Sequence, residues 1–292
     1  MTHRNVVADG FTSHKAFFID MDGVVNKGSQ VIPGAIDFIE KLKQGGYKFL
    51  FITNNSYFTP GDLRDRMYSI GIDVGPENFY TSAMATASFL RYQRKCFTAY
   101  VIGGKGLKRE LEAVGVTITS KKPDYVIVGE TEEYDYERII EATILIQEGA
   151  KFIATNPDIT GPTPRGPVPA CGALVAPIEK VTGVKAYFLG KPNPAMMYWA
   201  RKRLKVHSVN SFIIGDRMDT DIVGGLEAGM TCCLVLSGVT TVEIMNRYPY
   251  QPDYVFNSIA DIDPDSIVSR WEMKPDKSGR IDQSALSRNP CG

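Results

Sequence analysis

The chain has 292 residues, enough for one large domain or two of medium size, and its 43% of hydrophobic residues is typical of a globular protein. Its 33 Lys and Arg balance 33 Asp and Glu, which argues against a basic nucleic-acid surface and against a polybasic membrane patch. No apolar run approaches the ~20 residues that cross a bilayer, and no apolar signal region follows Met1, so we expect a cytoplasmic protein without nucleic-acid or membrane partners.

The cysteine and histidine content argues against several classes of hydrolase. The five cysteines are scattered without a C-x-x-C pair, as is usual for reduced thiols, and there are only three histidines. The sequence has no H-E-x-x-H zinc motif, no G-x-S-x-G elbow and no C-x5-R loop. Any chemistry must therefore rest on other groups.

The first third of the chain predicts alternating strands and helices. Residues 15–21 and 49–52 are short apolar runs typical of buried strands. Apolar spacing over 33–45, with a proline at its start and glycines at its end, predicts a helix, and a second helix is expected over 59–70. This alternation predicts right-handed crossovers and a parallel sheet.

The middle of the chain repeats the alternation. Three strands and two helices are expected, at 99–102, 125–128 and 152–154 and at 105–114 and 135–148. These elements suffice for a separate small α/β domain over 83–185.

The pattern of the first third returns after residue 190. Helices are expected at 195–204 and 221–228, and strands at 211–214 and 231–236.

We therefore predict an α/β protein with a doubly wound parallel-sheet core, formed by residues 15–82 and 186–262, and a smaller α/β domain inserted between these halves. Residues 263–292 are polar and lack periodicity, so we expect a loosely held tail, although Trp271 could dock on the rest of the protein.

Two carboxylates follow the first predicted strand. Asp20 and Asp22 stand two residues apart, so their side chains should point the same way, at the sheet edge where ligands of open α/β sheets bind. Like charges this close need a cation or a proton. A solvated turn is the alternative, whereas a helix–loop–helix calcium site fails because Val31 stands where its final Glu is required.

A second acidic cluster follows the strand expected at 211–214. Asp216 comes directly after this strand, and Asp219 and Asp221 follow within the segment GDRMDTD. Oxygen ligands of this kind suit a hard cation, and Mg²⁺ best. Either later carboxylate could instead cap the following helix, which leaves Asp216 as the better ligand candidate.

Two more segments complete a candidate phosphate site. Thr53 ends the second strand, and its hydroxyl, with the N–H groups of Asn54 and Asn55, could hold phosphate oxygens. Lys191 lies in the segment LGKPNP, ahead of a helix. Thr and Asn are also common turn residues, and an exposed Lys is usually solvated, so these residues matter only in combination with the carboxylates.

The four motifs appear in a recognisable order: DMDG at 20–23, TNN at 53–55, GKP at 190–192 and GDRMDTD at 215–221. This arrangement resembles the haloacid dehalogenase superfamily of phosphatases. The separation of Thr53 and Lys191, 191 − 53 = 138 residues, leaves room for the large α/β cap of one subgroup. Within it, the segments at 79–86, 154–158, 169–174 and 235–239 are similar to NagD-like phosphatases, and the resemblance covers residues 15–262.

The resemblance implies a phosphomonoester hydrolase that works through an aspartyl-phosphate. Asp20 would attack phosphorus, while Asp22 would protonate the leaving alkoxide and then take a proton from the hydrolytic water. Mg²⁺ would be held by Asp20, Asp216 and the Asp22 carbonyl, and would offset the negative charge.

The resemblance also assigns the surrounding residues. Thr53, the Asn54 amide and Lys191 would bind the phosphate oxygens. Asp221 and Arg217 would not contact the substrate themselves but would position the groups that do, with Asp221 orienting Lys191 or a metal-bound water.

The expected substrate is a small phosphorylated metabolite, first of all a nucleoside 5′-monophosphate. Pyridoxal phosphate, phosphoglycolate, glycerol phosphate and sugar phosphates are alternatives. Asn156 and Asp158 are expected to line the leaving-group pocket of the cap, beside a proline-rich loop at 161–167 that departs from the family pattern. Caps of this family often pair, so a homodimer through the cap is expected.

Two other activities fit the sequence less well. A binding protein on a retired enzyme scaffold tends to lose the nucleophile or the acid, and both Asp20 and Asp22 are present. Dehalogenases of the superfamily lack the second of these carboxylates.

Overall fold

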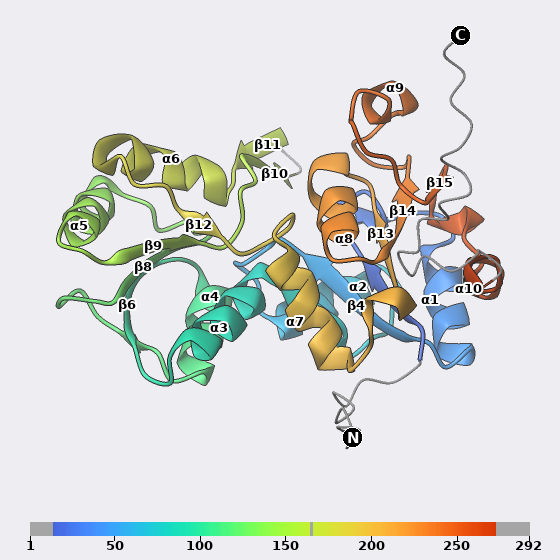
Figure 1. Ribbon diagram of the computed structural model, residues 1–292, viewed down its shortest axis with the longest axis horizontal. Coiled ribbons are helices and arrows are strands. Elements are labelled where there is room, and N and C mark those ends of the chain that lie inside the picture. The colour runs from blue at the N-terminus through green and yellow to red at the C-terminus, as the bar shows by residue number, and fades with distance from the viewer. Residues whose placement is uncertain (1–13, 164–165, 273–292) are drawn as a thin grey trace, which may run out of the picture.

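The computed structural model describes residues 14–163 and 166–272, which form two lobes, each built on a parallel sheet (Figure 1). The sheet of the larger lobe, the core, has six strands, in the order β15 (Tyr254–Phe256), β14 (Thr231–Val235), β13 (Ser211–Gly215), β1 (Ala16–Ile19), β4 (Lys48–Thr53) and β5 (Phe79–Thr81). The first strand thus lies between strands from the two halves of the chain, as the predicted doubly wound α/β fold requires.

Helices cover both faces of the core sheet. Strand β1 is fully buried and sends Phe17 and Ile19 to one face and Phe18 to the other. The first face packs against α1 (Ala35–Gln44), α2 (Pro60–Ser69) and α10 (Pro264–Glu272). The second packs against α7 (Pro194–Leu204) and the π-helical turn Met218–Ile222, which leads into α8 (Val223–Glu227). The short helix α9 (Val242–Met245) follows β14.

The smaller lobe, the insert, has its own five-stranded sheet, in the order β12 (Tyr187–Phe188), β9 (Lys151–Ala154), β8 (Tyr125–Val128), β6 (Thr98–Ile102) and β7 (Thr117–Ile118). Helices α3 (Ser82–Gln93) and α4 (Lys105–Ala113) cover one face, and α5 (Tyr136–Gln147) and α6 (Cys171–Thr182) cover the other. The proposed extent of the insert, 83–185, contains every strand of this sheet except β12.

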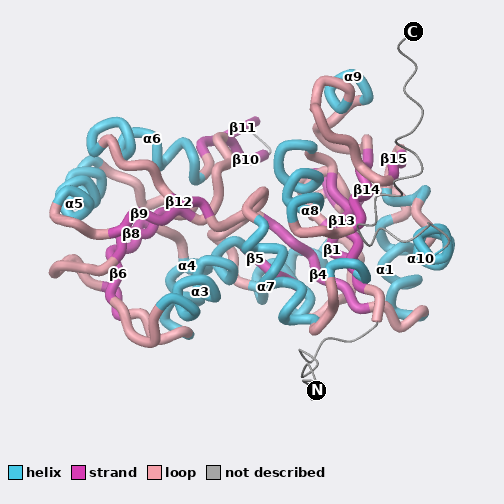
Figure 2. The backbone as a smooth tube through the Cα atoms, viewed as in Figure 1, coloured by secondary structure: helices cyan, strands magenta, loops and turns pink. Residues whose placement is uncertain are grey.

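Two short hairpins lie outside the main sheets. Strands β2 (Asn26–Lys27) and β3 (Gln30–Val31) follow the first acidic motif, and β10 (Thr160–Thr163) pairs antiparallel with β11 (Gly166–Pro169). The second hairpin contains the proline-rich stretch 161–167, of which 164–165 lie outside the described residues. It projects from the insert on the side of the core lobe (Figure 2).

Every predicted strand and helix starts and ends within two residues of an observed one, but several observed elements had no predicted counterpart, among them β5, α3, α6, β12, α9 and β15. The helix expected over 221–228 begins as the π-helical turn Met218–Ile222. Helix α2 shows how local chemistry sets such ends, because Pro60 stands in its first turn and Thr59 forms a reciprocal capping box with Asp62. In the described part of the chain, no helix is both long and apolar enough to cross a membrane.

The expected loose tail is wrong for residues 264–272, which form α10. Trp271 packs on Phe212 with ring centroids 6.2 Å apart, and Lys15 Nζ lies 3.5 Å from the centre of its ring. Ile267 and Val268 are buried beside it. A helix of nine residues is too short for its periodicity to stand out in a polar sequence. The rest of the expected tail, 273–292, lies outside the described residues.

Candidate active site

The register of the core sheet brings the ends of three strands together. Ile19 of β1 pairs with Ile214 of β13 on one side and with Phe51 of β4 on the other. The residues that follow, Asp20, Asp216 and Thr53, therefore lie at the same carboxyl edge of the sheet, the usual ligand edge of open α/β folds.

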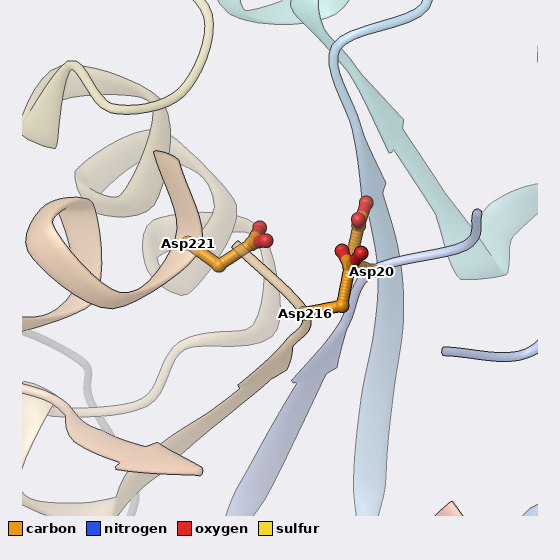
Figure 3. Close-up of side chains that lie close together, drawn as sticks. All are labelled: Asp20, Asp216 and Asp221. Carbon is orange, nitrogen blue, oxygen red and sulfur yellow. The ribbon is translucent and has the colours of Figure 1, made fainter. Parts of the chain in front are cut away.

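Three buried carboxylates meet at this edge. Asp20, Asp216 and Asp221 each offer an oxygen within 4.8 Å of the others, and Figure 3 shows Asp221 reaching toward the other two from the helical side. Asp216 Oδ2 accepts a hydrogen bond from Val239 N at 2.7 Å, whereas its buried Oδ1 has no hydrogen-bond partner among the described residues. A buried acceptor without a donor is costly, and a cation would satisfy it.

Two glycines let the backbone wrap closely around Asp216. A Cβ at Gly238 would lie 1.9 Å from Asp216 Oδ2, and one at Gly23 would lie 2.5 Å from the same atom. Gly23 also has a φ of 85°, in the left-handed region that favours glycine. The loops after β1 and β14 therefore fix the carboxylate in place.

Lys191 balances two of the carboxylates. Its side chain is only 3% exposed, and Nζ lies 2.6 Å from Asp20 Oδ1, 2.7 Å from Asp221 Oδ1 and 3.2 Å from the Ile52 carbonyl oxygen. Burial by itself lowers the pKa of this ammonium group, but the two carboxylates more than compensate and raise it above its usual value. Lys191 therefore stays charged.

One lysine is too little positive charge for this cluster. Burial raises the pKa of Asp20 well above its usual value, with Lys191 opposing the rise and the neighbouring carboxylates adding to it. Burial, reinforced by the charge of Asp221, raises the pKa of Asp216 to about 6. Both shifts arise from burial and from repulsion between carboxylates, which a divalent ion with oxygen ligands would offset.

The side chain of Asn54 ties the end of β4 to two other segments. Its Oδ1 accepts from Lys191 N at 2.7 Å, and its Nδ2 donates to the Lys191 carbonyl at 3.0 Å and to Asp158 Oδ2 at 2.9 Å. Thr53 is buried, and its Oγ1 accepts from Asn55 N at 3.1 Å. The expected phosphate-binding residues are thus assembled next to the carboxylates.

Asp22 lies apart from the three-carboxylate cluster. Its side chain keeps solvent contact and accepts a hydrogen bond from Asn26 Nδ2 at 3.1 Å. Partial desolvation of the carboxyl, opposed by the charge of Arg66, raises its pKa, which is the direction a proton donor needs.

Arg217 and Asp158 join the core to the insert. Arg217 is held mainly by Asp219, through contacts of 2.8 and 3.0 Å, and its Nη1 lies 3.9 Å from Asp158 Oδ1. Asp158 is half-buried and also accepts from Asn54. It therefore lies at the interface where the insert meets the site.

Asn156 differs from its expected role in the pocket lining. It has no exposed surface, and its Nδ2 donates to the Asn54 carbonyl at 2.7 Å and to Glu130 Oε1 at 2.6 Å. A side chain used in this way holds the loop after β4 and leaves no group for a pocket wall. Neither Glu130 nor its partner Ser56 was expected near the site, although Glu130 stands two residues after a buried strand.

Comparison with known proteins places these features in a family context. Residues 17–117 match the family described as haloacid dehalogenase-like hydrolase, and residues 188–262 match a HAD-hydrolase-like family. Dihydroxyacetone phosphatase of Corynebacterium glutamicum is 47% identical over 251 residues, which cover 86% of this chain and 91% of that protein.

A second relative is known in both sequence and structure. Ribonucleotide monophosphatase NagD of Escherichia coli is 42% identical over 249 residues, covering 85% of this chain and 98% of that protein. The solved structure of NagD from E. coli K-12 matches with a TM-score of 0.82 at 42% identity, over 86% of this chain and 99% of that one.

Proposed function

The chain belongs to the haloacid dehalogenase-like hydrolases and is a phosphatase of their NagD-like group; from this premise we propose that it hydrolyses phosphomonoesters with Mg²⁺ through an aspartyl-phosphate on Asp20. The observation that carries the proposal is the buried cluster of three carboxylates with Lys191. A dianionic phosphate can approach these carboxylates only if cations offset their negative charge.

The proposed reaction has two displacements at phosphorus. In the first, an oxygen of Asp20 forms a bond to phosphorus while the ester P–O bond breaks, and Asp22 gives its proton to the leaving oxygen. In the second, water attacks phosphorus, Asp22 takes its proton, and the Asp20–phosphorus bond breaks to release inorganic phosphate. Asp22 suits both roles because it keeps solvent contact and has a raised pKa.

Cationic and hydrogen-bonding groups would stabilise the transferred phosphoryl group. Lys191, already 2.6 Å from Asp20, is placed to neutralise one oxygen, and the Thr53 hydroxyl and the Asn54 N–H would donate to others. Asp221 holds the ammonium from the far side at 2.7 Å.

The metal would be held by the carboxylates of Asp20 and Asp216 and by the Asp22 carbonyl. The buried Asp216 Oδ1, which lacks a hydrogen-bond donor among residues 14–163 and 166–272, supports this assignment. When bound, Mg²⁺ supplies the positive charge that shields Asp20 from the anionic substrate.

The proposed substrate is a nucleoside 5′-monophosphate, in keeping with the printed name of the NagD relative. Dihydroxyacetone phosphate is a second candidate, since the phosphatase named for that activity is 47% identical against 42% for NagD. Phosphate release from both substrates, from glycerol phosphate and from pyridoxal phosphate decides between them by kcat/KM. A nucleotide value below that of dihydroxyacetone phosphate would overturn the first choice.

The chemistry is tested by replacing the nucleophile. Asp20→Asn is expected to abolish hydrolysis and acid-stable labelling of the protein by ³²P-substrate, with thermal unfolding still cooperative. Asp37→Asn, on the exposed side of α1, is the matched control and should behave as wild type. Near wild-type turnover by Asp20→Asn, or full activity of the wild type in excess chelator, would refute the proposal.

We also propose that the enzyme acts in the cytoplasm as a homodimer paired through the insert. Exposed apolar side chains on α5 and α6, among them Tyr136, Ile144 and Val181, favour this surface. Light scattering measures the mass in solution. A monomer, or a dimer that Val181→Glu leaves intact, would count against pairing through this face.

A further inference from the structure

Glu130 is a buried carboxylate of the insert that touches the loop of the core expected to bind phosphate. It follows β8 after Gly129, and its Oε2 accepts from the backbone N–H of Ser56 at 2.9 Å and from the Ser56 hydroxyl. Its Oε1 accepts from Asn156 Nδ2 at 2.6 Å. Glu130, Ser56 and Asn156 all lie outside the buried apolar clusters of the two lobes.

The donors and acceptors in this group are all satisfied when Glu130 is ionised. The Ser56 hydroxyl donates to the carboxylate and accepts from Glu130 N at 3.0 Å and from the Thr155 hydroxyl at 3.1 Å. Asn156 donates to Glu130 and to the Asn54 carbonyl, while its own Oδ1 accepts from Asp158 N at 3.1 Å. Both carboxylate oxygens therefore receive donors, as an acceptor-only group requires.

Burial raises the pKa of Glu130, and the hydrogen bonds from Ser56 and Asn156 oppose that rise. Both carboxylate oxygens thus have hydrogen-bond partners. A group of this kind specifies one geometry, because losing any member leaves a buried polar atom without its partner.

The contacts lead on to the phosphate-binding hydroxyl. The Asn54 carbonyl, which accepts from Asn156 Nδ2 at 2.7 Å and from the Ser82 hydroxyl at 2.5 Å, shares a peptide plane with the N–H of Asn55. That N–H donates to Thr53 Oγ1 at 3.1 Å. Fixing the carbonyl therefore fixes the peptide plane and, through it, the Thr53 hydroxyl.

We propose that Glu130 is a positioning residue for phosphoryl transfer: from the insert, it orients the Asn54–Asn55 peptide through Asn156 and anchors the end of the same loop at Ser56. This inference rests on the proposed phosphatase reaction. It adds that the insert helps to build the phosphate site of the core in addition to covering it.

Glu130→Gln is the sharpest test, because it keeps the shape and exchanges one acceptor oxygen for a donor. In one orientation the new NH₂ faces the amide of Asn156, and in the other it faces the N–H of Ser56, so one contact is lost either way. Glu132→Gln makes the same charge change on the surface of the same loop and is the control. With p-nitrophenyl phosphate and saturating Mg²⁺, kcat of Glu130→Gln is expected to fall roughly 10-fold to 100-fold with little change in KM.

The route through Asn156 is tested by a double-mutant cycle. In the Asn156→Ala background, Glu130→Gln is expected to change kcat by less than about 3-fold, because the link is already cut. Hydrogen exchange of the peptide that contains residues 54–56 should rise in Glu130→Gln and stay unchanged in Glu132→Gln, a readout that needs no turnover. If Glu130→Gln does not fold, Glu130→Asp, which keeps the charge but withdraws it by one methylene, is expected to lower kcat in the same way.

The outcomes separate the two proposals. A wild-type protein that hydrolyses no phosphate ester would overturn the proposed function, and unchanged exchange at 54–56 in Glu130→Gln would overturn the positioning role. A folded Glu130 variant with wild-type kcat would also overturn the positioning role. The same holds if the effects of Glu130→Gln and Asn156→Ala on kcat multiply fully in the double variant.

Discussion

Replacing Lys191 by Met tests how much the burial of its ion pairs contributes to the free energy of unfolding. The substitution keeps an unbranched side chain of similar length and removes the ammonium that lies 2.6 Å from Asp20 and 2.7 Å from Asp221. Two buried carboxylates then face each other without a cation. Breaking a buried ion pair from one side costs about 3–5 kcal/mol, because the partner charge stays desolvated.

A surface pair of equal length provides the control. Lys105 Nζ lies 2.7 Å from Asp62 Oδ1, but the Lys105 side chain is 59% exposed, against 3% for Lys191. Exposed pairs contribute about 0–1 kcal/mol. Lys105→Met is therefore expected to cost at most about a third of what Lys191→Met costs, although the two contacts have the same length.

The free energy of unfolding is measured by urea titration in chelator at pH 7.5 and pH 5.5. The cost of Lys191→Met should be smaller at pH 5.5, because removal of the lysine raises the pKa of Asp20 further and lets this carboxyl take up a proton. A cost below about 1 kcal/mol at pH 7.5, or one equal to that of Lys105→Met, would refute the reasoning.

Three other outcomes follow from the structure. The pKa of the Asp216 carboxyl is raised to about 6, so the metal-free folded protein binds a proton there more tightly than the unfolded chain does. The free energy of unfolding should therefore fall by up to about 3 kcal/mol as the pH rises from about 4 to about 6. Gly238→Ala places a Cβ against Asp216 and should lower kcat roughly 100-fold while raising the Mg²⁺ concentration for half activity. Trp271→Ala should lower the free energy of unfolding by about 1–3 kcal/mol, since the ring is partly buried against Phe212, and leave kcat unchanged.

Each of these has a matched check. Saturating Mg²⁺ should flatten the pH dependence of urea unfolding, and a slope that persists unchanged would assign it to other groups. Gly61→Ala, at a glycine of α2 whose added Cβ would meet only Thr59 Oγ1 at 3.7 Å, should keep near wild-type kcat, and the same activity in Gly238→Ala would contradict the close fit around Asp216. A Trp271→Ala protein as stable as wild type would show that α10 is not anchored by its ring.

Much of the site could be predicted because its chemistry stands directly at strand ends. Asp20, Thr53 and Asp216 each follow an apolar run, and parallel strands bring such residues to one edge whatever their distance in sequence. Lys191 needed the resemblance of motifs, since no local pattern distinguishes it from a solvated lysine.

The parts that could not be predicted depend on contacts between the lobes. In the sequence, Asn156 looks like an ordinary loop residue. Only the packing of the insert on the core brings its Nδ2 to 2.7 Å from the carbonyl oxygen of Asn54, 102 residues away. Glu130 and Ser56 are 74 residues apart and carry no signal in their spacing. Helix α10 was missed for a different reason: Ile267, Val268 and Trp271 do follow helical spacing, but a stripe this short in a polar segment is easily overlooked.

The return of the chain from the insert to the core has a mechanical consequence. Strand β12 ends at Phe188, only three residues before Lys191, and the link is held to the insert by Leu189 N on the Ala154 carbonyl at 3.1 Å and Gly190 N on the Thr155 carbonyl at 2.6 Å. Lys191 is thus attached to the insert through its backbone neighbours, while its ammonium group contacts the carboxylates of the core. If the insert rotates away from the core to admit a ligand, residues 189–190 would move with it. Opening of the site and displacement of the Lys191 ammonium group from the carboxylates would then be coupled.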